Sequence, residues 1–309
     1  MKILVTYRIP IESFAALGDE HDYVLPEKEY FTDHELIRVI GDYDALIPIF
    51  TRPLGRELID AGKRLKVISN FGVGYNNIDI AYARSKGIAV CNTPRSVCFP
   101  TAEMAMGLML SAARRIAECD RRVRVEKESM WGTMKNLGFT LEGRTLGIIG
   151  MGNIGKTVAE MAAAFRMEVI YHNRRSVVEK YERVDLETLL RRSDFVSIHT
   201  PLTGETHHML GERELAWLKP TAFLINTARG AIIQEAALVE SLVQKRIAGA
   251  ALDVFEYEPH ITEQLYHLDN VVLTPHNATG TIDTRIATGR EAVANILNFY
   301  AGHPTNVVN

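Results

Sequence analysis

Short apolar runs alternate with stretches of helical periodicity in the first third of the chain. The predicted strands are residues 2–6, 45–49, 67–69 and 89–91. The predicted helices between them are residues 34–40, 56–62 and 78–85. Strands that alternate with helices in this way predict a parallel sheet with crossover helices.

The same alternation returns between residue 145 and about residue 275. The predicted strands there are residues 145–149, 167–172, 195–199, 222–226, 247–252 and 271–273. Six parallel strands are enough for a complete doubly wound dinucleotide-binding fold. A last helix has apolar residues at helical spacing from Ile286 to Tyr300, and we expect it to return to the first domain.

These patterns predict an α/β protein with two doubly wound parallel-sheet domains. Residues 1–98 with 283–309 are expected to form a flavodoxin-like substrate domain, and residues 99–282 a Rossmann-type cofactor domain. Residues 101–115 are apolar on nearly all sides, so this helix should be buried between the domains or in a subunit interface. A homodimer is therefore expected.

The composition is that of an ordinary globular protein of 309 residues, 47% hydrophobic, with a formal net charge of −3. A charge this small gives no sign of a nucleic-acid or anionic-membrane surface. The spacing of Cys91, Cys98 and Cys119 fits no metal motif, and so few cysteines favour a reducing, cytoplasmic setting. The sequence has no apolar run of the 18 or more residues that a transmembrane helix needs.

The stretch from Thr145 to Lys156 carries the clearest chemical signal. Gly150, Gly152 and Gly155 follow a predicted strand in G-x-G-x-x-G spacing and open a predicted helix, which is the context of a dinucleotide-binding fingerprint. The first glycine permits the tight turn, the second lets the backbone approach a pyrophosphate, and the third allows helix and strand to pack closely. The N–H groups at the start of the helix favour the phosphates. The alternative is a glycine-rich turn that binds nothing.

The segment after the next strand bears on the choice of cofactor. Asn173 lies 23 residues after Gly150, where NAD-binding proteins usually carry an acidic residue for the ribose 2′-hydroxyl. Here Asn173 is followed by Arg174 and Arg175, which suit a 2′-phosphate. We therefore favour NADP (NADPH) over NAD. Alternatively, the two arginines are solvated charges at the end of a strand.

Three polar residues come just after three successive predicted strands: Arg229, Glu258 and His276. Ligands bind at the carboxyl ends of parallel strands, so these residues should share one edge of the sheet with the glycine loop. Together they supply an anion binder, an orienting acid and a proton donor. Singly, each could be a surface charge, a loop carboxylate or a capping residue.

A turn in the first domain is a candidate for binding an anion through its backbone. Gly72, Val73 and Gly74 follow a predicted strand, and a Gly-x-Gly turn leaves N–H groups available to an anion. Taken alone, an ordinary strand-to-helix connection is the simpler interpretation.

Taken together, these segments resemble the D-isomer-specific 2-hydroxyacid dehydrogenase family over nearly the whole chain. The matching motifs are Gly72-Val-Gly74-Tyr-Asn-Asn-Ile-Asp79, Thr101-Ala-Glu103, Gly147 to Gly155, His199-Thr-Pro-Leu-Thr203 with Thr206, Asn226-Thr-Ala-Arg-Gly230, Leu252 to Pro259 and Thr274-Pro-His276. The segment Asn173-Arg174-Arg175 is similar to the NADP-using glyoxylate/hydroxypyruvate reductase branch. The resemblance implies that a small 2-oxo acid is reduced to the D-2-hydroxy acid with hydride from NADPH.

The resemblance also implies roles for single residues. His276 would be the general acid that protonates the carbonyl oxygen, and Glu258 would bond its other ring nitrogen and favour the imidazolium. Arg229 would hold the substrate carboxylate with the N–H groups of Val73 and Gly74. The implied cofactor-binding residues are Thr101, Gly150, Gly152, Asn153, Ile154, Gly155, Asn173, Arg174, Arg175, Pro201, Thr206, Thr227, Ala228 and Asp253. Of these, Asp253 and the region of Thr227 would orient the nicotinamide.

The substrate and the class of function stay open at this point. Asn277 follows His276, where many members of the family have an apolar residue. No motif fixes the side-chain pocket, for which the candidates are Phe50, Thr51, Arg52, Tyr75 and Trp131. The substrate could instead be phenylpyruvate, 2-ketogluconate, 3-phosphoglycerate, formate or phosphite. The alternative from another class is a nucleotide-sensing protein like the family's corepressors.

Overall fold

The structure is a computed structural model that describes residues 1–49, 52–127, 131–174 and 177–309. The chain forms two compact units: unit 1 is Met1–Pro100 with Thr279–Asn309, and unit 2 is Thr101–Ala278. The sequence placed these divisions after residues 98 and 282. No helix in the described ranges is long and apolar enough to cross a membrane.

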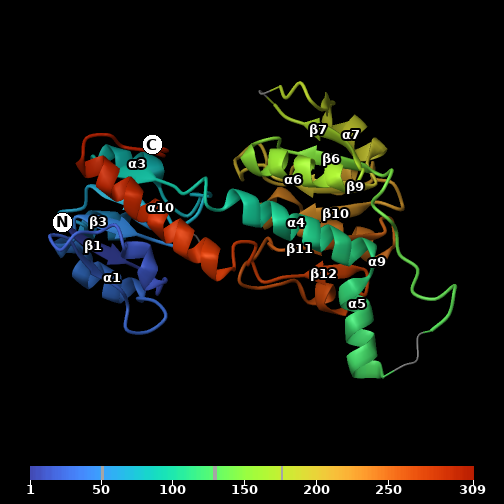
Figure 1. Ribbon diagram of the computed structural model, residues 1–309, viewed down its shortest axis with the longest axis horizontal. Helices are drawn as coiled ribbons and strands as arrows, with labels where there is room; N and C mark the ends of the chain where they lie inside the picture. Colours follow the sequence, from blue (N-terminus) through green and yellow to red (C-terminus); the bar gives the residue numbers. More distant parts are fainter. Residues whose placement is uncertain (50–51, 128–130, 175–176) are drawn as a thin grey trace. The chain divides into compact units, whose positions relative to one another are not determined.

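Unit 1 is built on a five-stranded parallel sheet (Figure 1). Its strands are β1 (Lys2–Val5), β2 (Asp22–Val24), β3 (Ala45–Ile47), β4 (Val67–Ser69) and β5 (Ala89–Cys91). The order β2-β1-β3-β4-β5 is flavodoxin-like, which confirms this part of the predicted fold class. The sequence did not predict β2, because this edge strand is short and mostly exposed and therefore lacks an apolar run.

Helices cover both faces of this sheet. They are α1 (Asp33–Val39), α2 (Arg56–Ala61), α3 (Ile80–Ser85) and α10 (Ile282–Tyr300), with the 3-10 turns η1 (Ile11–Phe14) and η2 (Ile40–Asp42). The first three pack in one core with Leu4 of β1, whereas α10 and η1 pack in a second core with Ile3 and Val5. Neighbouring residues of a strand point to opposite faces, so one apolar run serves both cores.

Unit 2 is built on a seven-stranded parallel sheet (Figure 1). Its strands are β6 (Thr145–Ile149), β7 (Glu168–His172), β8 (Glu182–Arg183), β9 (Phe195–Ile198), β10 (Phe223–Asn226), β11 (Gly249–Leu252) and β12 (Val271–Leu273). The strand order is β12-β11-β10-β9-β6-β7-β8. Starting from β6, the chain adds β7 and β8 on one side and then β9 to β12 on the other, as in the Rossmann fold. This confirms the second half of the predicted fold class. The extra strand, β8, has two exposed residues and no apolar signal.

The helices of unit 2 lie on both sides of its sheet. They are α4 (Cys98–Ala113), α5 (Ile116–Arg121), α6 (Asn153–Ala164), α7 (Leu186–Arg192), α8 (Glu212–Leu215) and α9 (Glu235–Val243), with the short turns η3 (Arg122–Glu126), η4 (Gly230–Ile232) and η5 (Glu263–His267). The helices α4 and α6 share one core with the sheet, and α7, α8 and α9 share the other.

The apolar helix α4 is covered by its own sheet. Ala105, Leu108 and Met109 are buried in the core that also contains Leu146 and Ile148 of β6. Met104 and Leu110 of the same helix are only partly buried, so the expected burial between domains or in a subunit interface stays a prediction. The small residues of α4 let the helix approach the strands closely, so the sheet alone buries much of its surface.

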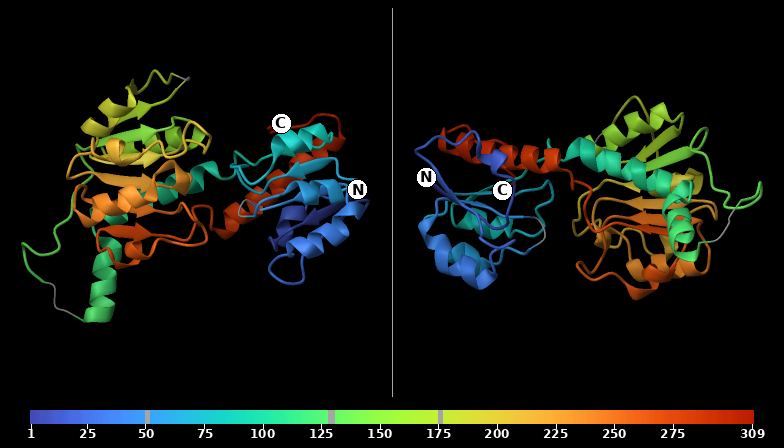
Figure 2. Two further views of the ribbon diagram at one scale, coloured as in Figure 1. Left: turned by 180° about the vertical axis from the view of Figure 1, so that it is seen from behind. Right: turned by 60° about the horizontal axis from the view of Figure 1, so that its bottom comes forward.

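Apolar surface is exposed on α5 and on the segment that follows it. In the views of Figures 1 and 2, α5 and the described loop that begins at residue 131 stand away from the sheet of unit 2. Val125 is 73% exposed, Trp131 88% and Met134 80%. Large apolar side chains that are this exposed mark a surface suited to a partner.

Candidate active site

The glycine loop joins β6 to α6 in the form that the sequence predicted. Gly150 has φ +100°, and a Cβ there would lie 2.6 Å from the carbonyl carbon of His199. A Cβ on Gly155 would lie 2.2 Å from the carbonyl oxygen of Gly150, so helix and turn touch at this point. At Gly152 a Cβ would meet nothing within 4 Å. The loop is thus tight toward the protein and open at the start of α6, as a pyrophosphate site requires.

Asn173 and Arg174 follow β7, beside this loop. The N–H of Met151 donates to Oδ1 of Asn173 at 3.1 Å, which ties the two loops together. Arg174 forms an ion pair with Glu205, and both side chains are more than half exposed. Arg183 of β8 donates to the carbonyl oxygens of Asn173 and Arg174 at 2.6 and 2.9 Å. Arg175 lies outside the described residues.

His276 and Glu258 form the centre of the candidate site, on the loops that follow β12 and β11. Nδ1 of His276 lies 2.8 Å from Oε2 of Glu258. The other carboxylate oxygen, Oε1, accepts the N–H of Phe255 at 2.9 Å. Because Glu258 takes Nδ1, a proton for a substrate would come from Nε2 of His276.

The charge of Glu258 suits it to orient the ring of His276. Burial raises the pKa of Glu258, but the hydrogen bond and charge of His276, the Phe255 N–H and the charge of Arg229 lower it more, so its pKa lies below the ordinary value. Glu258 is therefore ionised at neutral pH, so its carboxylate can accept the Nδ1–H of His276 and orient the ring.

Arg229 lies next to this pair, in the loop after β10. Burial lowers the pKa of Arg229 and the charge of Glu258 raises it; the guanidinium stays a cation because its ordinary value is far above neutral pH. Nη1 donates to the carbonyl oxygen of Ala228 at 2.6 Å. Asn226, to which the sequence assigned no role, braces the loop: its Nδ2 donates to the carbonyl oxygen of Arg229 at 2.9 Å.

Asp253 holds the histidine loop in place. Its carboxylate accepts the hydroxyl of Thr274 at 2.6 Å and the N–H groups of Asn277 and Ala278 at 3.0 and 2.9 Å. Its carbonyl oxygen accepts the N–H of His276, whose backbone is left-handed with φ 51°. Burial raises the pKa of Asp253. The bonds observed for Asp253 thus support His276, whereas its predicted contact with nicotinamide stays a prediction.

Two buried polar atoms near this loop suit a bound amide. Oγ1 of Thr227 and Oδ1 of Asn277 are buried and have no hydrogen-bond partner among the described residues. Buried polar atoms are normally paired, so these two oxygens suit a ligand that brings N–H donors. The carboxamide of a nicotinamide is such a group. The residues present therefore fit a nicotinamide cofactor.

His199, at the end of β9, is no second proton donor. Burial lowers its pKa to about 3, so the ring is neutral at physiological pH. Its Nε2 pairs with Oγ of Ser197 at 2.8 Å. Of these two histidines, His276 is the one that lies beside a carboxylate, that of Glu258.

The turn at residues 72–74 belongs to unit 1. Nδ2 of Asn70 donates to the carbonyl oxygens of Gly72 and Gly74 at 3.1 and 2.8 Å, and Nδ2 of Asn92 donates to that of Val73 at 2.8 Å. The side chains of the two asparagines thus take up all three carbonyls of the turn. The N–H of Gly72 donates to Oγ1 of Thr93 at 2.9 Å, and binding of an anion by the N–H groups of Val73 and Gly74 stays a prediction.

Comparison with known proteins agrees with this geometry. Residues 106–278, more than half of the chain, match the family model described as the NAD binding domain of D-isomer specific 2-hydroxyacid dehydrogenase. The chain belongs to this family. It is thus an oxidoreductase, which confirms the reaction class that the sequence predicted.

Relatives resemble the chain over its full length. A glyoxylate reductase of Thermococcus litoralis is 41% identical over 324 aligned positions that cover 100% of this chain and 96% of the relative. The crystal structure of the TT0316 protein from Thermus thermophilus has a TM-score of 0.94, 38% identity and complete coverage of both chains. An NADPH-dependent glyoxylate/hydroxypyruvate reductase from Sinorhizobium meliloti, solved with NADP and malonate, has a TM-score of 0.88 and 30% identity, and covers 99% of this chain and 96% of its own.

The remaining residues that the sequence predicted to bind the cofactor lie on four different segments of this dehydrogenase. Asn153 and Ile154 open α6, and Ala228 lies beside Arg229. The hydroxyl of Thr206 donates to the carbonyl oxygen of Pro201 at 2.7 Å, so it holds its own turn. Thr101 is buried in the first turns of α4.

Of the candidates for the side-chain pocket, Arg52 and Tyr75 belong to unit 1 and Trp131 belongs to unit 2. Phe50 and Thr51 lie outside the described residues. Arg52 donates to the carbonyl oxygen of Phe31 at 2.7 Å, and Tyr75 is 37% exposed. Trp131 is 88% exposed on the segment after α5, so it does not line a pocket of its own unit. No group of three or more possible metal ligands occurs among the residues that the structure describes.

Proposed function

We propose that this protein reduces a small 2-oxo acid of the glyoxylate or hydroxypyruvate type to the D-2-hydroxy acid, with NADPH as hydride donor. The observation that supports this most strongly is the His276–Glu258 pair beside Arg229, which combines a proton donor with an anion binder. The names of the Thermococcus and Sinorhizobium relatives point to the same class of substrate.

The residues divide the work as follows. Arg229 binds the substrate carboxylate through its guanidinium fork, and the N–H groups of Val73 and Gly74 bind the same group. The Nε2–H of His276 donates a proton to the carbonyl oxygen, while Glu258 keeps the ring oriented through Nδ1. NADPH, when bound, supplies the hydride for the carbonyl carbon. After the transfer His276 is neutral, and solvent returns its proton.

NADPH is proposed over NADH because of the segment after β7. Asn173 and Arg174 occupy the position where an acidic residue would bond a free 2′-hydroxyl. The guanidinium of Arg174 can pair with a 2′-phosphate. Its present partner, Glu205, is exposed, and an exposed ion pair of this kind is weak enough to be exchanged.

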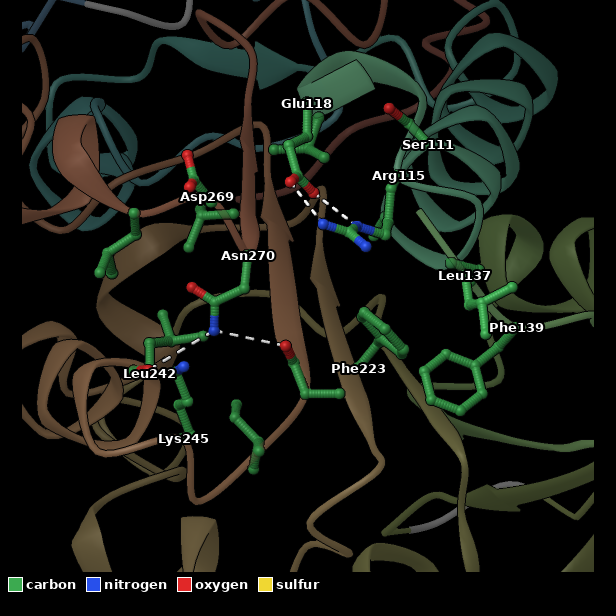
Figure 3. A pocket seen from close by; sticks show the side chains of 18 of the residues that line it. Ser111, Arg115, Glu118, Leu137, Phe139, Phe223, Leu242, Lys245, Asp269 and Asn270 are labelled. Carbon is green, nitrogen blue, oxygen red and sulfur yellow. Dashed lines mark hydrogen bonds and ion pairs between the residues drawn. The ribbon is translucent and has the colours of Figure 1, made fainter. Parts of the chain in front are cut away.

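We also propose that the protein is a homodimer and that it is cytoplasmic, as its three free thiols suggest. A cavity of about 640 Å³ in unit 2 is lined by residues from α4, α5 and the amino ends of three strands (Figure 3). Phe223 begins β10 and Val271 begins β12. The cavity therefore lies at the opposite edge of the sheet from Arg229 and His276, and it is not the reduction site.

The exposed segment supplies an occupant for this cavity. Arg115 and Glu118 form a bidentate ion pair at its rim, and Leu137 and Phe139 continue the lining (Figure 3). Trp131 and Met134, shortly before Leu137 in the chain, are 88% and 80% exposed. A two-fold interface would cover the segment of each copy with the cavity and helices of the other.

The test is NADPH oxidation with glyoxylate, hydroxypyruvate, phenylpyruvate and 2-ketogluconate, for the wild type and for His276→Ala. We expect turnover to be fastest with one of the first two acids and to be lost in the variant. NADPH binding without turnover of any acid would instead favour a nucleotide-sensing protein.

A further inference from the structure

A second histidine–glutamate pair joins the loop that carries Glu258 to the segment between β9 and α8. Nε2 of His208 is 2.5 Å from Oε1 of Glu256, and the side chain of Glu256 is 9% exposed. Glu256 precedes Glu258 by two residues, yet the two carboxylates serve different partners: Glu258 reaches His276, and Glu256 reaches His208 and Glu235. The loop is therefore held by two carboxylates with separate sets of partners.

The backbone N–H groups of Glu256 and Glu235 each donate to the side-chain carboxylate of the other residue. The N–H of Glu235 donates to Oε2 of Glu256 at 2.9 Å, and the N–H of Glu256 donates to Oε2 of Glu235 at 2.8 Å. The hydroxyl of Thr262 donates to Oε1 of Glu235. Glu235 is the first residue of α9 and is 4% exposed, so a carboxylate from another loop caps this helix. Two buried carboxylates can lie this close because each of them has its own donors.

This network joins the loops that carry the catalytic groups. The loop of Arg229 leads directly into α9, whose first N–H is bound by Glu256. At Gly230 the same loop is so close to the neighbouring one that a Cβ would lie 1.9 Å from the carbonyl carbon of Phe255. The N–H of His208 donates to the carbonyl oxygen of Ala231 at 2.8 Å. A shift of Glu256 would therefore move both loops.

We propose that Glu256 is a positioning residue of this reductase, which fixes Glu258 against His276 and keeps Arg229 beside them. The inference rests on the proposed catalytic roles of these three residues. Glu256 accepts a hydrogen bond on each of its two oxygens. Glutamine cannot accept at both positions, because one of its two terminal groups is an NH2 donor. A misplacement of about 1 Å is enough to cost ~10²-fold in rate.

The experiment compares Glu256→Gln with Glu263→Gln. Glu263 also pairs with a histidine, His267, at 3.2 Å, but both side chains are more than 70% exposed, so it is a matched control. We expect Glu256→Gln to lower kcat by ~10- to 10²-fold and to leave KM for NADPH within about twofold. The alkaline fall of kcat should shift to lower pH, because a displaced Glu258 no longer accepts the hydrogen bond of the catalytic histidine.

Two further variants distinguish the possible outcomes. Glu258→Gln is measured in parallel: full activity in this variant would refute the catalytic assignment itself. If Glu258→Gln loses activity but Glu256→Gln and Glu263→Gln have the same kcat, the catalytic assignment stands and only the positioning role of Glu256 is overturned. A lower kcat in Glu256→Gln with an unmoved pH profile would overturn it as well.

If Glu256→Gln does not fold, substitutions of its partly exposed partner His208 test the positioning role instead. His208→Leu removes the donor to Glu256, whereas His208→Gln keeps an N–H donor there. We expect the pH shift and the loss of kcat in His208→Leu, and their recovery in His208→Gln. Identical behaviour of these two variants would overturn the proposal.

Discussion

The carboxylate of Glu258 lies 2.8 Å from the imidazole of His276, although 18 residues separate them in the chain. They meet because β11 and β12 are adjacent parallel strands, so the loops that follow them leave the same edge of the sheet. Glu258 is held by the Phe255 N–H, and His276 by the carbonyl oxygen of Asp253. The distance between the two side chains is thus set by backbone contacts.

Loss of the proton donor should damage turnover more than binding. We expect His276→Ala to lower kcat by ~10²- to 10⁴-fold, with the Kd of NADPH nearly unchanged, because His276 acts on the substrate oxygen. Steady-state kinetics and fluorescence titration check this. His260→Ala is the control, because His260 is exposed and lies two residues beyond Glu258. An active His276→Ala with the wild-type pH profile would refute the assignment.

Because the space at Gly152 is open, a substitution there can change cofactor binding without changing the packing of the protein. A methyl group there meets no protein atom, and φ of −80° suits alanine. Gly152→Ala should therefore keep its Tm but weaken NADPH binding ~10-fold or more, a loss of about 1.4 kcal/mol, because the methyl group occupies the space of the pyrophosphate. Gly204→Ala, equally open, is the control. Unchanged NADPH affinity in Gly152→Ala would show that the phosphates bind elsewhere.

The ion pair between Arg174 and Glu205 predicts opposite effects of two substitutions on cofactor preference. Arg174→Ala should lower the NADPH/NADH ratio of kcat/KM by ~10-fold or more, since a hydrogen bond to a charged group contributes ~1.5–3 kcal/mol. Glu205→Gln should raise the ratio a few-fold, because it frees the guanidinium.

The control for this pair is Arg166→Ala, since Arg166 forms a similar exposed ion pair with Glu142. It should leave the ratio as in the wild type. Equal efficiency of the wild type with NADPH and NADH would remove the basis for an NADP preference.

Because Trp131 is so exposed, we expect it to lie at the centre of the proposed subunit interface. Trp131→Ala should weaken the dimer by ~2 kcal/mol, about 30-fold in Kd, as truncation of a buried aromatic anchor does. Sedimentation across a concentration series measures this. Val177→Ala, another exposed apolar residue of unit 2, should leave the association unchanged. A wild type that stays monomeric at micromolar concentration would contradict the interface.

We expect the carboxylate of Asp194 to stabilise the fold to an extent that depends on pH. It accepts the N–H of Thr145 and the Nζ of Lys219, each at 3.0 Å. Burial raises the pKa of Asp194, but these bonds and the charges of Lys219 and Arg144 lower it more, so its pKa is below the ordinary value. The carboxylate therefore stabilises the fold above the ordinary pKa of ~3.9, and this contribution is lost as the pH falls through the lower folded value.

Asp194→Asn should accordingly lower the free energy of unfolding by ~1–3 kcal/mol at pH 7 and by less near pH 3. Urea unfolding at the two pH values measures the difference. The control is Asp120→Asn, because Asp120 forms an exposed pair with Arg124 that should contribute little. An effect of Asp194→Asn that is equal at both pH values would contradict the charge argument.

The sequence by itself determined both sheets, the glycine loop and the edge at which the chemistry lies. Buried parallel strands need apolar runs, a pyrophosphate turn needs glycines, and parallel strands bring Arg229, Glu258 and His276 to one edge. All of these follow from local pattern and chain order. The strands β2 and β8 were missed because they are short, exposed edge strands without such a pattern.

Only the tertiary structure decided which groups meet. Glu256 and Glu258 are both acidic and two residues apart, and nothing in their neighbours in sequence shows that one caps α9 while the other orients His276. The bonds from Asp253 to the histidine loop likewise depend on donors more than 20 residues away. A side chain takes its partners from whatever the fold brings beside it, so its role depends on packing between distant segments rather than on its own residue type.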